Sequence, residues 1–190
     1  MRGLMRGLMH GLDYKWKTLI VIAVGTFMVV LDTTIVIIAL PRIITVFGSS
    51  VEQGQLILTG YMLALAVVMP ATAYLSQTFG TKRMYVLTLV TFTLSSMLCG
   101  AAWSMPSLII ARVLQGLGGG MMQPLGMGML FRVTPPRQRG TIMGVYALPV
   151  MVAPIAGPTL GGYLVEYVNW RWVFYLKDRK STRLNSSHRL

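Results

Sequence analysis

The sequence predicts an all-α integral membrane protein, and three of its features lead to that fold class. Hydrophobic residues make up 54% of the 190 residues and charged residues only 12%, against about 25% in soluble domains. The apolar residues form long blocks and do not alternate with polar ones, as they would in barrel strands. Each block has about the 20 residues that a helix needs to cross the hydrocarbon. Since backbone groups in lipid must bond within their own segment, such blocks predict helices.

We expect five complete transmembrane helices and the start of a sixth, which together form an incomplete six-helix bundle over residues 18–176. The expected helices, in chain order, cover residues 18–40, 54–76, 84–103, 106–131 and 141–167, with the sixth starting near Trp170. Residues 1–17 precede the first helix. That helix is too long for the apolar part of a secretory signal peptide, so we expect it to be retained.

Basic residues outside the expected helices give the orientation. Nine fall in one set of alternate segments and two in the other. The nine are Arg2, Arg6, Lys15, Lys17, Lys82, Arg83, Arg132, Arg137 and Arg139, and the two are Arg42 and Arg171. The positive-inside rule therefore predicts a cytoplasmic N-terminus. The net charge of +12 follows from this topology and does not indicate a nucleic-acid partner.

The last residues, 178–190, differ sharply in composition from the rest. They are polar and basic at the point where a sixth apolar helix should gain length, and 178–188 resembles the translation of a common sequencing-adapter oligonucleotide. We expect native sequence to stop at Leu176 or Lys177, and we leave residues 178–190 out of the fold. The alternative is a short soluble C-terminal tail.

Asp32 is the only acidic residue deep inside an expected helix. A carboxylate there costs about 2.5–3.5 kcal/mol on insertion scales, so it should face a partner or an aqueous cavity rather than lipid. This placement favours a role in binding protons or a cationic substrate. The alternative is a structural carboxylate held by Thr33, Thr34 or a neighbouring helix.

Arg112 is the only basic residue well inside an expected helix. Gln115 and Gly116 follow three and four positions later and therefore share its face. A guanidinium keeps its proton, so Arg112 would act as a fixed charge beside a carboxyl group. The alternative is an arginine that extends to the outer membrane surface.

The fifth expected helix is rich in residues that bend helices or let them pack closely. These are Pro149, Pro154, Gly157, Pro158, Gly161 and Gly162. Such a helix suits a seal or pivot between two bundles, and the alternative is close packing without a mechanistic role.

The sequence lacks the residue patterns that metal sites, phosphate-binding loops and catalytic sites require. The two histidines lie outside the expected helices, one cysteine cannot build a metal site, and no phosphate-binding GxxxxGK[ST] loop is present. We therefore expect no enzyme activity and no cofactor.

Four motifs resemble those of the EmrB/QacA-type drug:proton antiporters, the fourteen-helix branch of the major facilitator superfamily. They are Leu31–Pro41 in the first helix, Leu108–Gly120 in the fourth, Ala153–Gly162 in the fifth, and Asn169–Phe174 at the start of the sixth. They occur in the family's order, and the resemblance covers about residues 15–176. Residues 73–83 match the family's cytoplasmic gating motif in part, through Gly80, Lys82 and Arg83.

The sequence departs from the family pattern at three positions. Ile37 stands where the family usually has asparagine, and Gln77 where many members have aspartate. Ala153 replaces a glycine. The first change removes a polar cavity contact, and the second removes a charge relay through the gating loop.

The resemblance implies a bacterial inner-membrane transporter in which two helical bundles rock about a central cavity, and inward proton flow drives amphipathic or cationic compounds outward. Asp32 would bind the proton or cation, and Arg112 with Gln115 would tune it. Pro154, Gly157, Pro158, Gly161 and Gly162 would form the hinge. The partners would be lipid, protons, the transported compounds and a missing C-terminal half. Two alternatives stay open: a transporter of another solute, such as a sugar, peptide or siderophore, and a membrane-inserted fragment that transports nothing.

Overall fold

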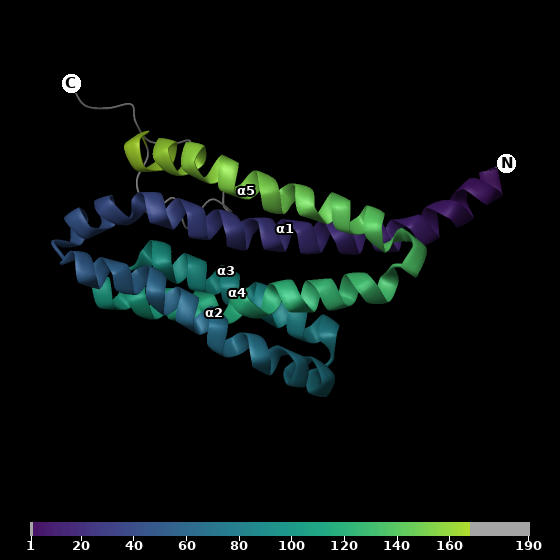
Figure 1. The fold of residues 1–190 in the computed structure, drawn as a ribbon, viewed down its shortest axis with the longest axis horizontal. Coiled ribbons are helices and arrows are strands. Elements are labelled where there is room, and N and C mark those ends of the chain that lie inside the picture. The colour runs from purple at the N-terminus through teal and green to yellow at the C-terminus, as the bar shows by residue number, and fades with distance from the viewer. Residues whose placement is uncertain (1, 168–190) are drawn as a thin grey trace, which may run out of the picture.

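The computed structural model describes the backbone of residues 2–167 and the side chains of residues 14–163, 166 and 167. Its elements are α1 (Arg2–Phe47), α2 (Val51–Phe79), α3 (Thr81–Ala101), α4 (Met105–Val133), the short 3₁₀ helix η1 (Pro136–Gln138) and α5 (Arg139–Tyr167). No strand occurs in this part of the chain, so the predicted all-α fold is confirmed there (Figure 1). The expected sixth helix near Trp170 and the tail 178–190 lie outside the described residues.

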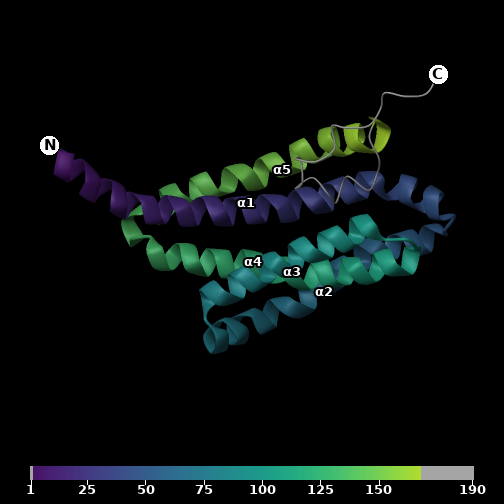
Figure 2. The ribbon, with the colours of Figure 1, turned by 180° about the vertical axis from the view of Figure 1, so that it is seen from behind.

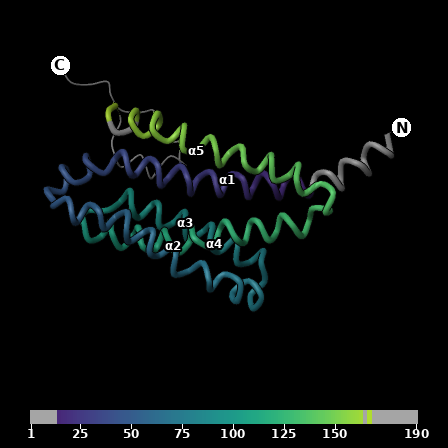
Figure 3. The backbone as a smooth tube through the Cα atoms, viewed as in Figure 1, coloured from purple at the N-terminus to yellow at the C-terminus, as the bar shows by residue number. Residues whose placement is uncertain are grey.

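The helices form two layers. In one layer α5 packs along α1, and in the other α4 packs along both α2 and α3 (Figures 1 and 2). The backbone trace in Figure 3 shows the two layers as separate runs of tube joined at their ends. The main contact between the layers is that of α1 with α4. Whatever holds these two helices together therefore holds the bundle together.

The helices extend beyond the apolar blocks from which they were predicted. The helix α1 already includes the residues before Thr18, and it continues through Pro41 to Phe47. Membrane thickness sets the length of the apolar block, whereas the helix itself can continue into the interface. One residue, Gly80, separates α2 from α3. Its φ of 85° lies in the region that glycine adopts without steric cost, so the chain reverses there in a single step.

Among the described residues, four segments are long and apolar enough to cross a membrane, namely Tyr14–Phe47, Val51–Phe79, Thr81–Ala101 and Pro136–Tyr163. The helix α4 was expected as a fifth, and it is not among them. At 29 residues it is as long as α2, but Arg112, Gln115 and its glycines lower its hydropathy. Because α4 is packed against α1, α2 and α3, it needs few apolar side chains toward lipid. Composition therefore supports four spans, and the crossing by α4 remains a prediction.

Glycines let α4 approach its neighbours closely. A Cβ added at Gly116 would lie 2.6 Å from the carbonyl oxygen of Tyr61 on α2. At Gly118 it would lie 2.8 Å from the backbone nitrogen of Phe92 on α3. Real Cβ atoms essentially never come within 3.0 Å of another heavy atom, so these contacts require glycine. Such small-residue contacts bring backbones together in membrane helices, where water provides no hydrophobic drive.

This packing predicts the effect of an alanine at Gly118. The Gly118→Ala variant should lose about 1–3 kcal/mol of stability, the usual cost of overpacking, because backbone atoms of α3 cannot move aside as a side chain can. The measurement is the apparent melting temperature of the protein in detergent, followed by circular dichroism.

Gly128 provides the matched control on the same helix. No atom lies within 4 Å of a Cβ added there, so Gly128→Ala should leave the melting temperature unchanged or raise it slightly through better helix propensity. Equal melting temperatures for the two variants would contradict the close approach of α3 and α4.

Candidate functional site

Asp32 lies in the membrane-spanning part of α1 on the side that faces α4. Its side chain is only 8% exposed, although it bears a carboxyl group and is surrounded by apolar turns of helix. One apolar cluster, which includes Ile35 and Leu108, lies toward the α1–α2 connection. A second, which includes Ile22 and Met122, lies toward the opposite end. The carboxylate therefore lies between two apolar clusters, where an unpaired charge would be very costly.

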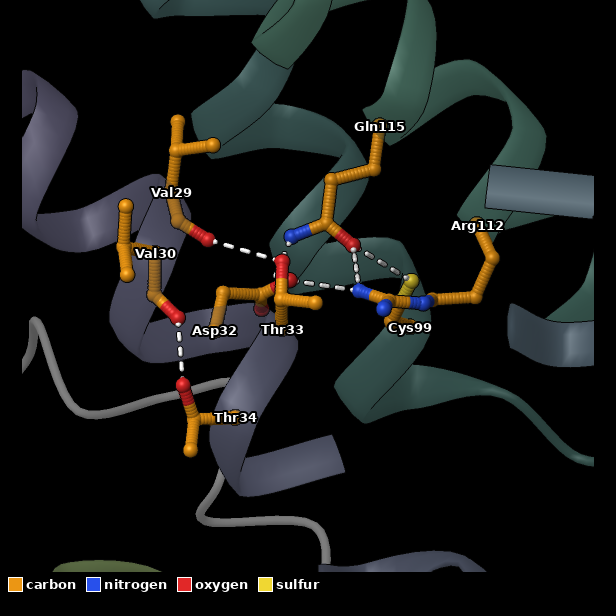
Figure 4. Close-up of polar contacts among 8 residues, drawn as sticks. All are labelled: Val29, Val30, Asp32, Thr33, Thr34, Cys99, Arg112 and Gln115. Atoms are coloured by element: carbon orange, nitrogen blue, oxygen red, sulfur yellow. Dashed lines mark hydrogen bonds and ion pairs between the residues drawn. The ribbon is translucent and has the colours of Figure 1, made fainter. Parts of the chain in front are cut away.

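Arg112 and Gln115 provide the partners of this carboxylate. They lie three residues apart on α4, so one helical turn presents both to α1, and both side chains are fully buried. Arg112 Nη1 donates to Asp32 Oδ2 at 2.5 Å, and Gln115 Nε2 donates to Asp32 Oδ1 at 3.0 Å. Each carboxylate oxygen thus accepts one hydrogen bond from α4 (Figure 4).

The two partners are also bonded to each other. Arg112 Nη1 donates to Gln115 Oε1 at 2.7 Å, which closes a three-residue network, the Asp32–Arg112–Gln115 triad. Cys99 on α3 adds a weaker contact from its Sγ to the same Gln115 oxygen, at 3.5 Å. Gln115 is thus oriented from both sides, with its oxygen toward donors and its nitrogen toward the carboxylate (Figure 4).

The ring of Tyr61, on α2, provides a face for the guanidinium. The central carbon of the Arg112 guanidinium lies 4.3 Å from the ring centroid, well within the distance of a cation–π contact. Arg112 therefore contacts α1 through an ion pair and α2 through an aromatic ring. The sequence did not predict Tyr61 or the contact of Cys99, because both depend on how helices that are distant in the chain approach each other.

The structure bears on the alternatives that the sequence left open. Thr33 and Thr34 donate to carbonyl oxygens of their own helix, at Val29 and Val30, with distances of 3.0 and 2.8 Å. Asp32 is instead held by the neighbouring helix α4, so the alternative of a structural carboxylate stays open beside a role in proton binding. The idea that Arg112 extends to the membrane surface is wrong, because the residue is 0% exposed and bonded to Asp32.

The predicted hinge residues of α5 divide into two groups. Gly157 and Gly161 face α1, where an added Cβ would lie 2.6 Å from Cβ of Thr34 and 3.3 Å from Ile35 Cγ2. These contacts lie on the helical turn that follows Asp32. The other three, Pro154, Pro158 and Gly162, do not touch this turn: the prolines are exposed, and no atom lies within 4 Å of a Cβ added at Gly162.

The predicted gating residues lie elsewhere. Gly80, Lys82 and Arg83 occupy the α2–α3 turn and the first turn of α3, and all three are exposed. They belong to one end of the bundle, and the triad belongs to its middle.

The three departures from the family pattern leave the triad intact. Ile37 is 49% exposed, so its side chain is not part of the buried contact between α1 and α4. Gln77 is exposed near the end of α2. Ala153 is fully buried within the apolar cluster that includes Ile35, so the extra methyl group is accommodated there.

Comparison with known proteins gives a consistent family. The family model described as "Major Facilitator Superfamily" matches residues 22–176. The "Uncharacterized MFS-type transporter YhcA" of Bacillus subtilis (strain 168) is 39% identical over 157 residues, which cover 83% of this chain and 30% of the relative. The "Putative multidrug resistance protein MdtD" of Serratia proteamaculans (strain 568) is 38% identical over 167 residues, which cover 88% of this chain and 35% of the relative.

A solved structure agrees on the fold. A bacterial homologue of the human lysosomal transporter Spinster, in an inward-facing and unoccupied conformation, matches with a TM-score of 0.69 and 18% sequence identity. The match covers 93% of this chain and 45% of that chain. The present chain thus spans about a third of the length of the curated relatives it matches. The chain belongs to the Major Facilitator Superfamily of membrane transporters.

Proposed function

We propose that the whole transporter to which this chain belongs exports amphipathic or cationic compounds in exchange for protons. The observation that carries the proposal is the buried Asp32–Arg112–Gln115 triad, which contains a titratable carboxyl group at the contact between the two layers. The naming of relatives such as MdtD for multidrug resistance supports the choice of cargo. We further propose a bacterial inner membrane and a cytoplasmic N-terminus, since basic residues cluster at that end.

The proton would act by changing the bond between α1 and α4. With Asp32 ionised, both of its oxygens accept hydrogen bonds from α4, and its charge balances that of Arg112. A proton on Asp32 removes the negative charge and uses one acceptor position. Since a buried ion pair is strongly destabilised when one charge is removed, protonation loosens α1 from α4. Release of the proton restores the bond.

The helix α5 would follow this change because it packs on α1. Gly157 and Gly161 place α5 directly against Thr34 and Ile35, within one turn of Asp32. A displacement of α1 therefore cannot occur without a response from α5. In this scheme the two glycines couple the carboxyl group to the seal between the two halves of the transporter, and Arg112 stays as the fixed charge.

The first test removes the titratable group. Asp32→Asn keeps the size of the side chain but cannot take up and release a proton, so drug efflux driven by a pH gradient should fall to the background of empty vesicles. Efflux is measured in energised membrane vesicles that contain the whole transporter. Glu52→Gln, an exposed acidic position at the start of α2, is the matched control and should transport normally.

Unchanged efflux by a well-folded Asp32→Asn protein would remove Asp32 from the mechanism. If the native transporter exports none of the dyes and drugs but moves a sugar, peptide or siderophore in a proton-coupled way, the triad keeps its proposed role and only the proposed cargo is wrong. A counterflow assay distinguishes export from import.

The second test separates the guanidinium from its charge. Arg112→Lys keeps a cation but loses the planar group that contacts Asp32, Gln115 and Tyr61 together. Transport should fall about tenfold or more, in line with the roughly 1.5–3 kcal/mol of a hydrogen bond to a charged group. Initial rates of efflux give the measurement, and Arg42→Lys, at an exposed position on α1, is the control. Full transport with lysine would show that only the charge matters.

The third test concerns the contact between α5 and α1. Gly157→Ala places a methyl group against Thr34 and should raise the leak of protons through drug-free vesicles, because α5 no longer seals against α1. A pH-sensitive dye inside the vesicles reports the leak. Gly162→Ala meets no atom within 4 Å and should leak no more than the native protein. If both variants leak equally, the seal does not depend on this contact.

A further inference from the structure

A second feature of the bundle lies far from the triad, at the end where α2 turns into α3. A cavity of about 890 Å³ opens there, within the size range of ligand sites. The first residues of the span in α1, the α2–α3 turn and the last turn of α4 surround it. Figure 1 shows these three segments at the same end of the molecule.

The polar part of the lining is strongly basic. Four cationic side chains contribute to it: Lys17, Lys82, Arg83 and Arg132. They come from three different helices, and no Asp or Glu is among the described residues that line the cavity. Four cationic groups around one hollow make it complementary to an anion of comparable size.

The remaining lining is apolar and aromatic. Tyr14, Phe79 and Val86 are each more than half exposed, and Val21 adds a further aliphatic wall. A soluble anion such as free phosphate would make no favourable contact with this apolar surface. Aromatic side chains at the edge of a membrane span typically lie at the level of the lipid headgroups, which places the basic groups at that level as well.

We propose that this cavity binds the headgroup of an anionic phospholipid. The phosphate would lie among Lys17, Lys82, Arg83 and Arg132, and an acyl chain would follow Phe79 and Val86 toward the hydrocarbon. Basic pockets between transmembrane helices at the cytoplasmic surface are suited to such headgroups. The proposal requires only that the bundle lies in a membrane, and it does not depend on drug efflux.

The bound lipid would join the two layers at this end of the bundle. Lys17 belongs to α1 in one layer, whereas Lys82, Arg83 and Arg132 belong to the other layer. A phosphate shared between them would bridge the layers electrostatically, as Asp32 does in the middle of the membrane. It would also neutralise Lys82 and Arg83 beside the Gly80 turn.

The test is lipid retention by the whole transporter. The protein is taken from nanodiscs of equal parts phosphatidylcholine and phosphatidylglycerol, and native mass spectrometry counts the bound lipids. Phosphatidylglycerol should be retained in preference to phosphatidylcholine. The double variant Lys17→Gln/Arg132→Gln should lose that preference by about tenfold, because each basic side chain near an anionic lipid contributes substantially to binding.

Lys15→Gln/Arg137→Gln is the matched control. It removes the same charge at the same end of the bundle, from α1 and from η1, but neither residue lines the cavity. The control should retain phosphatidylglycerol as the native protein does. An equal loss of the preference for phosphatidylglycerol in both double variants would show that general surface charge causes it, which would overturn the proposal.

Two further arms identify the ligand. Inorganic phosphate at the concentration of the lipid phosphate should fail to displace phosphatidylglycerol; complete displacement would show a simple anion site without a lipid. Equal retention of phosphatidylcholine and phosphatidylglycerol by the native protein would also refute the proposal. Neither readout involves transport, so failure here and failure of the proposed efflux are distinguishable.

Discussion

The buried ion pair between Asp32 and Arg112 is the constraint on which the rest of the bundle depends. Neither charge is tolerable in an apolar interior alone, and each becomes tolerable only when the other is within hydrogen-bond distance. The pair therefore sets the spacing of α1 and α4, which make the main contact between the layers. Gln115 donates to the second carboxylate oxygen, so α4 holds both oxygens of Asp32. A small change in charge at one atom thus acts directly on the contact that joins the layers.

Close backbone packing follows from the same constraint. Arg112 can be fully buried only if helices surround it on several sides, and α4 achieves this by having glycine where α2 and α3 approach. Gly116, one turn after Arg112, rests on the backbone of Tyr61, whose ring in turn contacts the guanidinium. Side chains at these positions would move α2 away and expose the charge. The glycines and the arginine are therefore parts of one arrangement, not separate motifs.

The residues of the triad stand out in the sequence, whereas the ends of the helices do not. Asp32 and Arg112 stand out because an ionisable residue inside an apolar block is costly and therefore rare. Helical spacing then places Gln115 on the same face of the helix as Arg112. Tyr61 and Cys99 could not be found, since their roles come from contacts between helices distant in sequence. The length of α1 was underestimated because hydropathy indicates which residues lie in the hydrocarbon of the membrane and does not indicate where the helix ends. The helix α4 shows the converse: its interior position lowers the very hydropathy by which spans are recognised.

The polar features of the bundle occupy two levels, and both involve the contact between the same two layers. In the middle, Asp32 of α1 meets Arg112 of α4 with opposite charges. At the end with the Gly80 turn, Lys17 of α1 and Arg132 of α4 line the same cavity with like charges. An ion pair thus joins the layers at the first level, and the lipid phosphate that we propose would join them at the second. In these two proposals a proton acts at the first level and an anionic headgroup at the second, so both would act on the contact between the same two layers.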